Sequence, residues 1–246
     1  MIYFVGAGAG DPELITLKGY KLLQTADLII YAGSLVNKEI LQYAKEGARI
    51  IDSASLHLQE IVDEMVQTHK QGKLVVRLHT GDPSLFGAIG EQIEMLKQYD
   101  IPYTVVPGVS SFLAAAASVG KEYTVPGKTQ TVIITRMEGR TPVPSTESIA
   151  SLAKHQSTMA IFLSVGMIEQ VVEQLLTSYG PDTPIAIVEK ASWSDERVIK
   201  GRLDTIVSLT KEAGITKTAL ILVGQFLQET GKSKLYDKDF AHEYRQ

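Results

Sequence analysis

Short apolar runs alternate with amphipathic segments along most of the chain. Apolar runs of four or five residues that end at turn residues indicate buried strands, whereas apolar residues spaced three and four apart indicate helices. The expected strands cover residues 2–6, 28–31, 48–51, 74–78, 103–106, 131–135, 159–163, 185–188, 198–200 and 219–223. The expected helices cover residues 16–26, 36–44, 58–71, 89–97, 109–119, 168–176 and 203–213. Strands that alternate with helices predict an α/β protein whose sheets contain much parallel pairing.

One irregular segment interrupts this alternation. Residues 120–128 contain two glycines and Pro126 and show no apolar periodicity, which favours a domain boundary. We therefore expect an N-terminal α/β domain over residues 1–120 and a C-terminal α/β domain over residues 121–246. The length of 246 residues suits one large domain or two small ones. From Gln228 onward the chain is polar, and we expect this tail to fray.

Composition excludes several classes of protein. The chain has no cysteine, which excludes disulfides, zinc–thiolate sites, iron–sulfur clusters and cysteine nucleophiles. The five histidines show no metal-ligand spacing, so no metal site is expected. A net charge of -4 argues against nucleic acid as the main partner. No apolar run reaches the roughly 18 residues of a membrane span, and the first residues indicate a strand rather than a signal peptide, so the expectation is a cytoplasmic protein without a membrane partner.

The first glycine-rich turn covers residues 6–12, between the first strand and the first helix. Such a turn suggests a dinucleotide fold, but Asp11 stands where the third glycine of that fingerprint belongs. Its negative charge would lie where a pyrophosphate has to bind. The favoured interpretation is a tight turn in which Asp11 caps the following helix, and the turn's backbone could still line a ligand trough.

Two later turns also follow strands. In residues 80–87, Gly81 permits close backbone approach, and Asp82 either accepts hydrogen bonds from a ribose or amino group or caps the helix that begins at Ile89. In residues 107–111, Ser110 and Ser111 either cap a helix or face a ligand. Because ligands of open α/β sheets bind beyond the carboxyl ends of the strands, the three turns would converge if their strands are parallel.

The second half of the chain offers two candidate binding loops. Arg136 and Arg140 lie in a proline-rich loop that suits carboxylate recognition, since a guanidinium binds a carboxylate through two hydrogen bonds. The alternative is a solvated loop with an internal Arg–Glu pair. Trp193 lies in a loop between strands, where it is either a stacking platform or a local packing residue.

Together, these motifs resemble the tetrapyrrole methylase family from Gly6 to about Gly224. The general family motifs are residues 5–16, 81–83 and 107–111, although alanine replaces the proline often found at position 9. Residues 78–83, 130–136, 138–144 and 190–193 are similar to the branch that methylates carbon 11 of a corrinoid precursor. Phe86 stands where that branch is expected to have a tyrosine, so no phenol chemistry is assigned there.

The resemblance implies two α/β domains with a cleft between them, a homodimer, and S-adenosylmethionine as the cofactor. The implied cofactor contacts are Ala9, Thr80, Gly81, Asp82, Leu85, Ser110, Ser111, Leu163, Ala191 and Leu220. The implied substrate is a tetrapyrrole, precorrin-4 or cobalt-precorrin-4. Arg136 and Arg140 are expected to bind its acetate and propionate groups, and Asp82 or a water to accept the proton released after methyl transfer.

Two alternatives stay open at this point. The first is another activity within the family, on uroporphyrinogen, another precorrin, a diphthamide intermediate or ribosomal RNA. Uroporphyrinogen methyltransferases usually carry a second glycine where Thr80 stands, and the acidic balance disfavours RNA. The second alternative is a metabolite-binding α/β protein without enzymatic activity.

Overall fold

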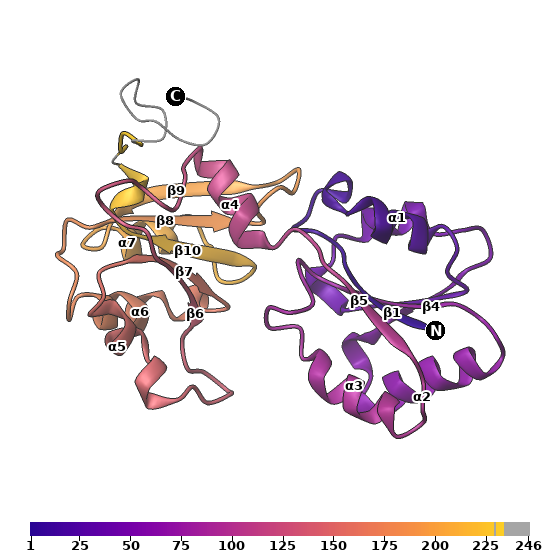
Figure 1. Cartoon of the computed structure of the whole chain (residues 1–246). Coiled ribbons are helices and arrows are strands. Elements are labelled where there is room, and N and C mark those ends of the chain that lie inside the picture. The colour runs from indigo at the N-terminus through magenta and orange to yellow at the C-terminus, as the bar shows by residue number, and fades with distance from the viewer. Residues whose placement is uncertain (229, 234–246) are drawn as a thin grey trace, which may run out of the picture. The chain divides into compact units, whose positions relative to one another are not determined.

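The computed structural model describes residues 1–228 and 230–233, and it contains two five-stranded sheets (Figure 1). The first compact unit comprises Met1–Ala114 together with Lys190–Glu196, and the second comprises Ala115–Glu189 and the chain from Arg197 onward. One division between the units lies within a helix, α4 (Ser111–Val119), and the expected domains of residues 1–120 and 121–246 stay a prediction. The frayed tail expected from Gln228 falls largely outside the described residues. The cleft expected between two domains stays a prediction.

The first unit is built on a parallel sheet. Its strands are β1 (Ile2–Gly6), β2 (Leu28–Tyr31), β3 (Arg49–Asp52), β4 (Val75–His79) and β5 (Tyr103–Val106). Their spatial order is β3-β2-β4-β1-β5, and every pairing is parallel, as the alternating pattern predicted. Because β1 lies between β4 and β5, the carboxyl ends of these three strands are neighbours, with Gly6 opposite His79 and Val5 opposite Val106.

Helices cover both faces of this sheet (Figure 1). The unit contains α1 (Leu17–Leu23), α2 (Leu58–Lys70) and α3 (Ile89–Lys97), with 3-10 helices at Pro12–Leu14, Gly33–Leu35, Lys38–Tyr43 and Ser53–Ser55. One buried cluster joins α2 and α3 to one sheet face, and a second joins α1 to the other. The hydroxyl of Thr16 accepts a 3.2 Å hydrogen bond from Gly19 N and caps α1. The helix expected over residues 36–44 is the 3-10 helix Lys38–Tyr43.

The second sheet contains less parallel pairing than the alternation of strands and helices predicts. Its strands are β6 (Val132–Arg136), β7 (Thr158–Phe162), β8 (Pro184–Glu189), β9 (Arg197–Arg202) and β10 (Ala219–Val223), in the order β6-β7-β10-β8-β9. Only β6 and β7 pair in parallel, whereas β10 pairs antiparallel with β7 and β8, and β8 with β9. The connection between β8 and β9 has no helix, and so short a connection joins antiparallel strands.

The helices of the second unit pack on one buried cluster. They are α5 (Ile149–Ala153), α6 (Ile168–Leu175) and α7 (Ile206–Glu212), with 3-10 helices at Ser145–Glu147, Val165–Met167 and Gln225–Leu227. All three helices contribute side chains to the cluster, including Ile149, Val171 and Ile206, which are almost fully buried. The pattern did not predict α5, because five residues are too few to establish a helical period.

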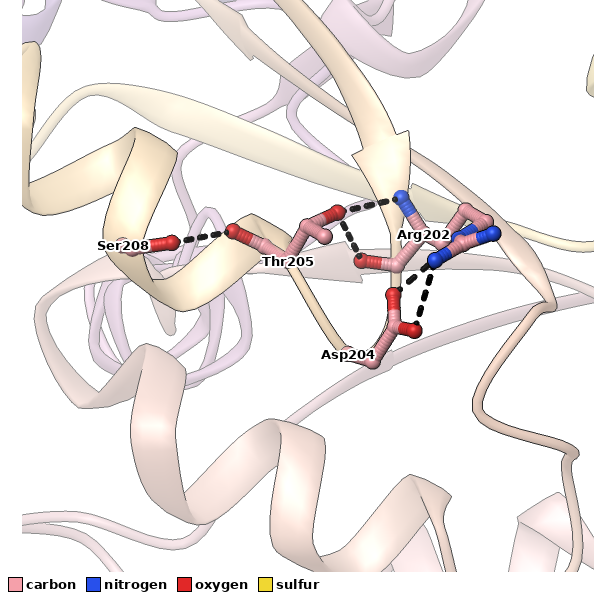
Figure 2. A network of polar contacts seen from close by, with 4 residues as sticks. All are labelled: Arg202, Asp204, Thr205 and Ser208. Carbon is pink, nitrogen blue, oxygen red and sulfur yellow. Dashed lines mark hydrogen bonds and ion pairs between the residues drawn. The ribbon is translucent and has the colours of Figure 1, made fainter.

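Local polar contacts determine where α7 begins (Figure 2). The hydroxyl of Thr205 accepts a hydrogen bond from Arg202 N and donates one to Arg202 O, both at 3.1 Å. The Arg202 guanidinium donates two hydrogen bonds to Asp204, and Ser208 Oγ donates to Thr205 O at 2.8 Å. These contacts close the corner between β9 and α7, so the chain reverses within a few residues.

Candidate functional site

Three glycine turns meet at the carboxyl end of the first sheet. Gly81 N donates a 2.8 Å hydrogen bond to Gly8 O, and Gly8 N donates a 3.3 Å bond to Gly81 O. Gly108 is also close, since a Cβ atom added there would lie 2.2 Å from Gly81 O and 2.8 Å from the Cα of Gly6. The convergence predicted for the three turns is therefore present, and it depends on residues without side chains.

Asp82 joins the second of these turns to the third. Its Oδ2 accepts a 2.9 Å hydrogen bond from Gly108 N, and its Oδ1 accepts bonds from the amide and hydroxyl of Ser84. Partial burial raises the pKa of Asp82, but the hydrogen bonds from Ser84 and Gly108 outweigh that effect and lower the pKa below its ordinary value. Asp82 does not cap α3, whose N-cap position is held by Ala88 in a left-handed conformation at φ +48°. The carboxylate is thus ionised and engaged in bracing the turns.

Polar groups surround the backbone of Gly81, close to the start of α4. Gly81 has a φ of +61°, and a Cβ atom added there would make only ordinary contacts, 3.5 Å from Ser110 Cα and 3.7 Å from Ser111 N. Ser110 is buried, and Ser111 is half-buried at the start of α4. Within residues 1–228 and 230–233, the buried Thr80 Oγ1 has no hydrogen-bond partner. Such a hydroxyl is expected to find its partner in a water or a ligand, so Thr80, Gly81 and the serines fit a small polar molecule.

The first glycine turn is held by the protein itself. Asp11 Oδ1 accepts a 2.8 Å hydrogen bond from Glu13 N, and Asp11 caps the 3-10 helix Pro12–Leu14, whereas α1, the first helix expected from the sequence, is capped by Thr16. Gly10 O accepts a 2.9 Å hydrogen bond from Asn37 Nδ2, and Ala9 O accepts one of 3.3 Å from Trp193 Nε1. The amides of Ala7, Gly8 and Asp11 also donate to oxygen atoms of the protein, so these N–H groups are not available to a phosphate, which agrees with the turn's poor match to a phosphate-binding loop.

The other candidate contacts divide between the two units. Leu85 is half-buried and Ala191 is 4% exposed, and both belong to the first unit with Ala9, Thr80–Asp82 and Ser110–Ser111. Leu163 and Leu220 belong to the second unit. Leu220 is buried in β10, whereas Leu163 is 61% exposed and has a φ of +54°, which is unusual for a leucine. Exposure and backbone strain together mark Leu163 as a candidate for function.

The two candidate arginines, both in the second unit, have different surroundings. The guanidinium of Arg136 donates hydrogen bonds to the carbonyl oxygens of Met137, Thr141 and Pro142, at 3.3, 3.2 and 2.8 Å. Arg136 thus stabilises its own loop instead of forming the internal Arg–Glu pair weighed as the alternative. Arg140 is exposed in this loop, and the described part of the chain provides no hydrogen bond or ion pair to it. Of the two, Arg140 is available for an external carboxylate.

A buried polar cluster beneath β4 was not predicted. Arg77 is 5% exposed and donates 3.2 Å hydrogen bonds to Gln92 Oε1 and to Ile30 O, and burial lowers its pKa to about 10. Burial, with a smaller contribution from Arg77, lowers the pKa of His79 to about 3, so this imidazole is neutral near pH 7. Gln92 Nε2 donates to Ala88 O, at the end of the turn that carries Gly81 and Asp82. In the sequence, the only indication of this cluster was a single charged residue, Arg77, within an otherwise apolar strand.

The described residues contain neither a metal-binding cluster nor a membrane-spanning helix. In residues 1–228 and 230–233, no group of three or more histidine, aspartate or glutamate side chains could hold a metal ion. Over the same residues, no helix combines the length and apolar character needed to cross a membrane.

Comparison with known proteins covers nearly the whole chain. Residues 1–207 match the family model of tetrapyrrole (corrin/porphyrin) methylases. A cobalt-precorrin-4 C(11)-methyltransferase of Methanocaldococcus jannaschii is 56% identical over 99% of this chain and 95% of its own length. A solved structure described as a cobalt precorrin-4 methyltransferase is 45% identical, with a TM-score of 0.90, over 93% of this chain and 96% of that chain.

A more distant structure contains a bound small molecule. The uroporphyrin-III C-methyltransferase of Thermus thermophilus, complexed with S-adenosylhomocysteine, is 30% identical with a TM-score of 0.77. The match covers 92% of this chain and 93% of that chain. The glycine turns, the two-sheet α/β fold and these similarities lead to one conclusion: this chain belongs to the tetrapyrrole methylase family.

Proposed function

We propose that this protein transfers a methyl group from S-adenosylmethionine to carbon 11 of precorrin-4 or cobalt-precorrin-4, in cobalamin biosynthesis. The main support for the proposal is the similarity to cobalt-precorrin-4 methyltransferases, at up to 56% identity over nearly the full length of both chains. The convergence of the three glycine turns supports it, because several residues expected to bind the donor, including Thr80, Gly81 and Ser110, lie there. On the same ground we propose a cytoplasmic homodimer.

The donor, when bound, supplies an electrophilic methyl group and its own leaving group. In this proposal the donor is bound largely through backbone groups, by Thr80, Gly81, Leu85, Ser110 and Ser111 together with Ala9 and Ala191. Leu163 and Leu220 complete its contacts. Asp82 contacts the donor and keeps the turns together. Holding two reactants in line contributes roughly 7–11 kcal/mol to lowering such a barrier, so alignment is the main task of these residues.

Asp82, the candidate base, is a weak acceptor for the last proton. The hydrogen bonds to Asp82 that lower its pKa make its carboxylate a poor proton acceptor. We therefore assign the proton released after methyl transfer to water in contact with solvent, and keep Asp82 as a positioning group.

The assay of this function uses donor labelled with carbon-13 in its methyl group. Incubation with precorrin-4 and, separately, with its cobalt form is expected to yield a product heavier by one labelled methyl group. Carbon-13 NMR should place that group on carbon 11, and a methyl group at another position would assign a different member of the family. Absence of product from both substrates, beside an active control enzyme, would remove the proposal.

Replacing Arg140 with alanine should weaken substrate binding specifically. Loss of a charge-assisted hydrogen bond to a carboxylate is expected to raise KM for the macrocycle about tenfold and to leave donor affinity unchanged. Steady-state kinetics with either reactant varied would measure both effects. Arg49→Ala is the matched control, because it removes an exposed arginine whose ion pair with Glu64 lies in the first unit. If Arg140→Ala behaves like this control, Arg140 belongs to a solvated loop.

A further inference from the structure

The single tryptophan of the chain packs directly on the first glycine turn. A Cβ atom added at Gly10 would lie 2.0 Å from Trp193 Cδ1 and 2.3 Å from Nε1, so the indole occupies the position of the missing side chain. The indole N–H donates a hydrogen bond to Ala9 O at 3.3 Å. Lys190 Nζ lies 5.7 Å from the ring centroid, which places a cation near the indole face. The absence of a side chain at Gly10 is therefore what lets the ring reach the turn.

The backbone around Ala191 is held in a strained conformation. Lys190 and Ser192 have φ values of +50° and +69°, and neither is a glycine. Such residues persist only where their surroundings hold them. Here Trp193 N donates to Lys190 O at 2.9 Å, Ser192 N donates to Glu196 Oε2 at 2.6 Å, and Asp11 N donates to Ser192 Oγ at 3.0 Å. The last bond ties this segment to the same turn that the indole contacts.

We propose that Trp193 is a positioning residue for the donor site. Its contact with Gly10 holds the first glycine turn and the strained backbone of residues 190–192 in the conformation that binds the donor. The inference rests on the proposed function, in which Ala9 and Ala191 contact the donor. Ordering these segments before binding reduces the entropy that binding has to remove, so loosening them weakens affinity without altering the methyl transfer itself.

Gly10→Ala is the sharpest single test. Gly10 lies outside the positive-φ region, so an alanine there introduces no backbone strain and acts through its collision with the indole. We expect the affinity for S-adenosylhomocysteine, measured by calorimetry, to fall about tenfold. KM for the donor should rise in parallel while kcat at saturating donor stays within about twofold, as expected for a residue that acts on binding. Acrylamide should quench the fluorescence of the displaced Trp193 more strongly than in the wild type.

A double-mutant cycle shows whether Gly10 acts through Trp193. Trp193→Ala alone should weaken donor binding about as much as Gly10→Ala. In the Trp193→Ala background, the alanine at position 10 meets no ring and should add less than about a twofold effect. Trp193→Phe keeps an aromatic ring on Gly10 and loses the N–H bond to Ala9, so its affinity should lie nearer to the wild type. Additive effects of Gly10→Ala and Trp193→Ala would overturn the inference.

The control is another aromatic residue beside a lysine. Tyr99 is 41% exposed, and Lys70 Nζ lies 5.5 Å from its ring centroid, so Tyr99→Ala removes a similar pair away from the glycine turns. Its donor affinity should equal that of the wild type. If the wild-type protein itself fails to bind S-adenosylhomocysteine, the proposed function and this inference both fall. If the wild type binds and the Gly10 and Trp193 variants bind equally tightly, only this inference falls.

Discussion

Gly108→Ala should destabilise the first unit by more than about 3 kcal/mol, because its added methyl group has no space. The new Cβ would lie 2.2 Å from Gly81 O, 2.8 Å from Gly6 Cα and 3.0 Å from Gly6 C, and all three are backbone atoms. No rotamer change relieves such contacts, so the turn after β5 would have to move away from β1 and from the turn after β4. This movement would also break the hydrogen bond from Gly108 N to Asp82.

Thermal unfolding followed by tryptophan fluorescence measures this effect. Trp193 belongs to the first unit, so its emission reports on the part of the molecule that the substitution disturbs. We expect the midpoint to fall by about 10 °C or more. Gly90→Ala is the matched control: a Cβ there meets nothing within 4 Å, and alanine within α3 should stabilise the helix by roughly 0.5–1 kcal/mol. Equal midpoints for the two variants would contradict the close approach of the three turns.

Gly81→Val should reduce donor affinity more than about 100-fold, by combining a blocked space with backbone strain. Valine at a φ of +61° is strongly disfavoured, and its branched side chain would project toward Ser110 and Ser111. That space is the one assigned to the donor. Calorimetry with S-adenosylhomocysteine measures the loss.

A second valine variant separates the two causes. Gly47 has a φ of +76°, and a Cβ added there meets nothing within 4 Å, so Gly47→Val introduces similar strain in open space. Its stability should fall as in Gly81→Val, while its donor affinity should stay at the wild-type value. If Gly81→Val also keeps wild-type affinity, the donor binds elsewhere.

Much of the fold followed from local patterns. The strands and most helices were predicted within a few residues, because buried strands and amphipathic helices each have a period that short segments reveal. The parallel first sheet followed from the alternation of strands and helices. The pairing in the second sheet did not, because β10 lies between β7 and β8 although it comes last of the five strands in the chain. Partner choice between distant strands depends on packing that no local window contains.

In the candidate site, too, local patterns predicted some features, and others depended on distant residues. Glycines after strand ends predicted which turns meet, since parallel strands place their carboxyl ends together. The roles of individual side chains depended on distant partners. Asp82 accepts a hydrogen bond from a residue 26 positions away, and Trp193 donates one to a residue 184 positions away. While those partners were unknown, it was reasonable to interpret Asp82 as a helix cap and Trp193 as a local packing residue.

The buried guanidinium of Arg77 has a consequence for strand alignment. β4 is buried along its whole length, so burial alone scarcely distinguishes its native alignment from one shifted by a single residue. Val76 and Leu78 face the α1 side, while Val75 lies on the α2–α3 side with Arg77 and its partner Gln92. A shift by one position would place the guanidinium in the apolar cluster against α1, where an unpaired charge is severely penalised. Arg77 therefore discriminates against misaligned strands in the centre of the sheet.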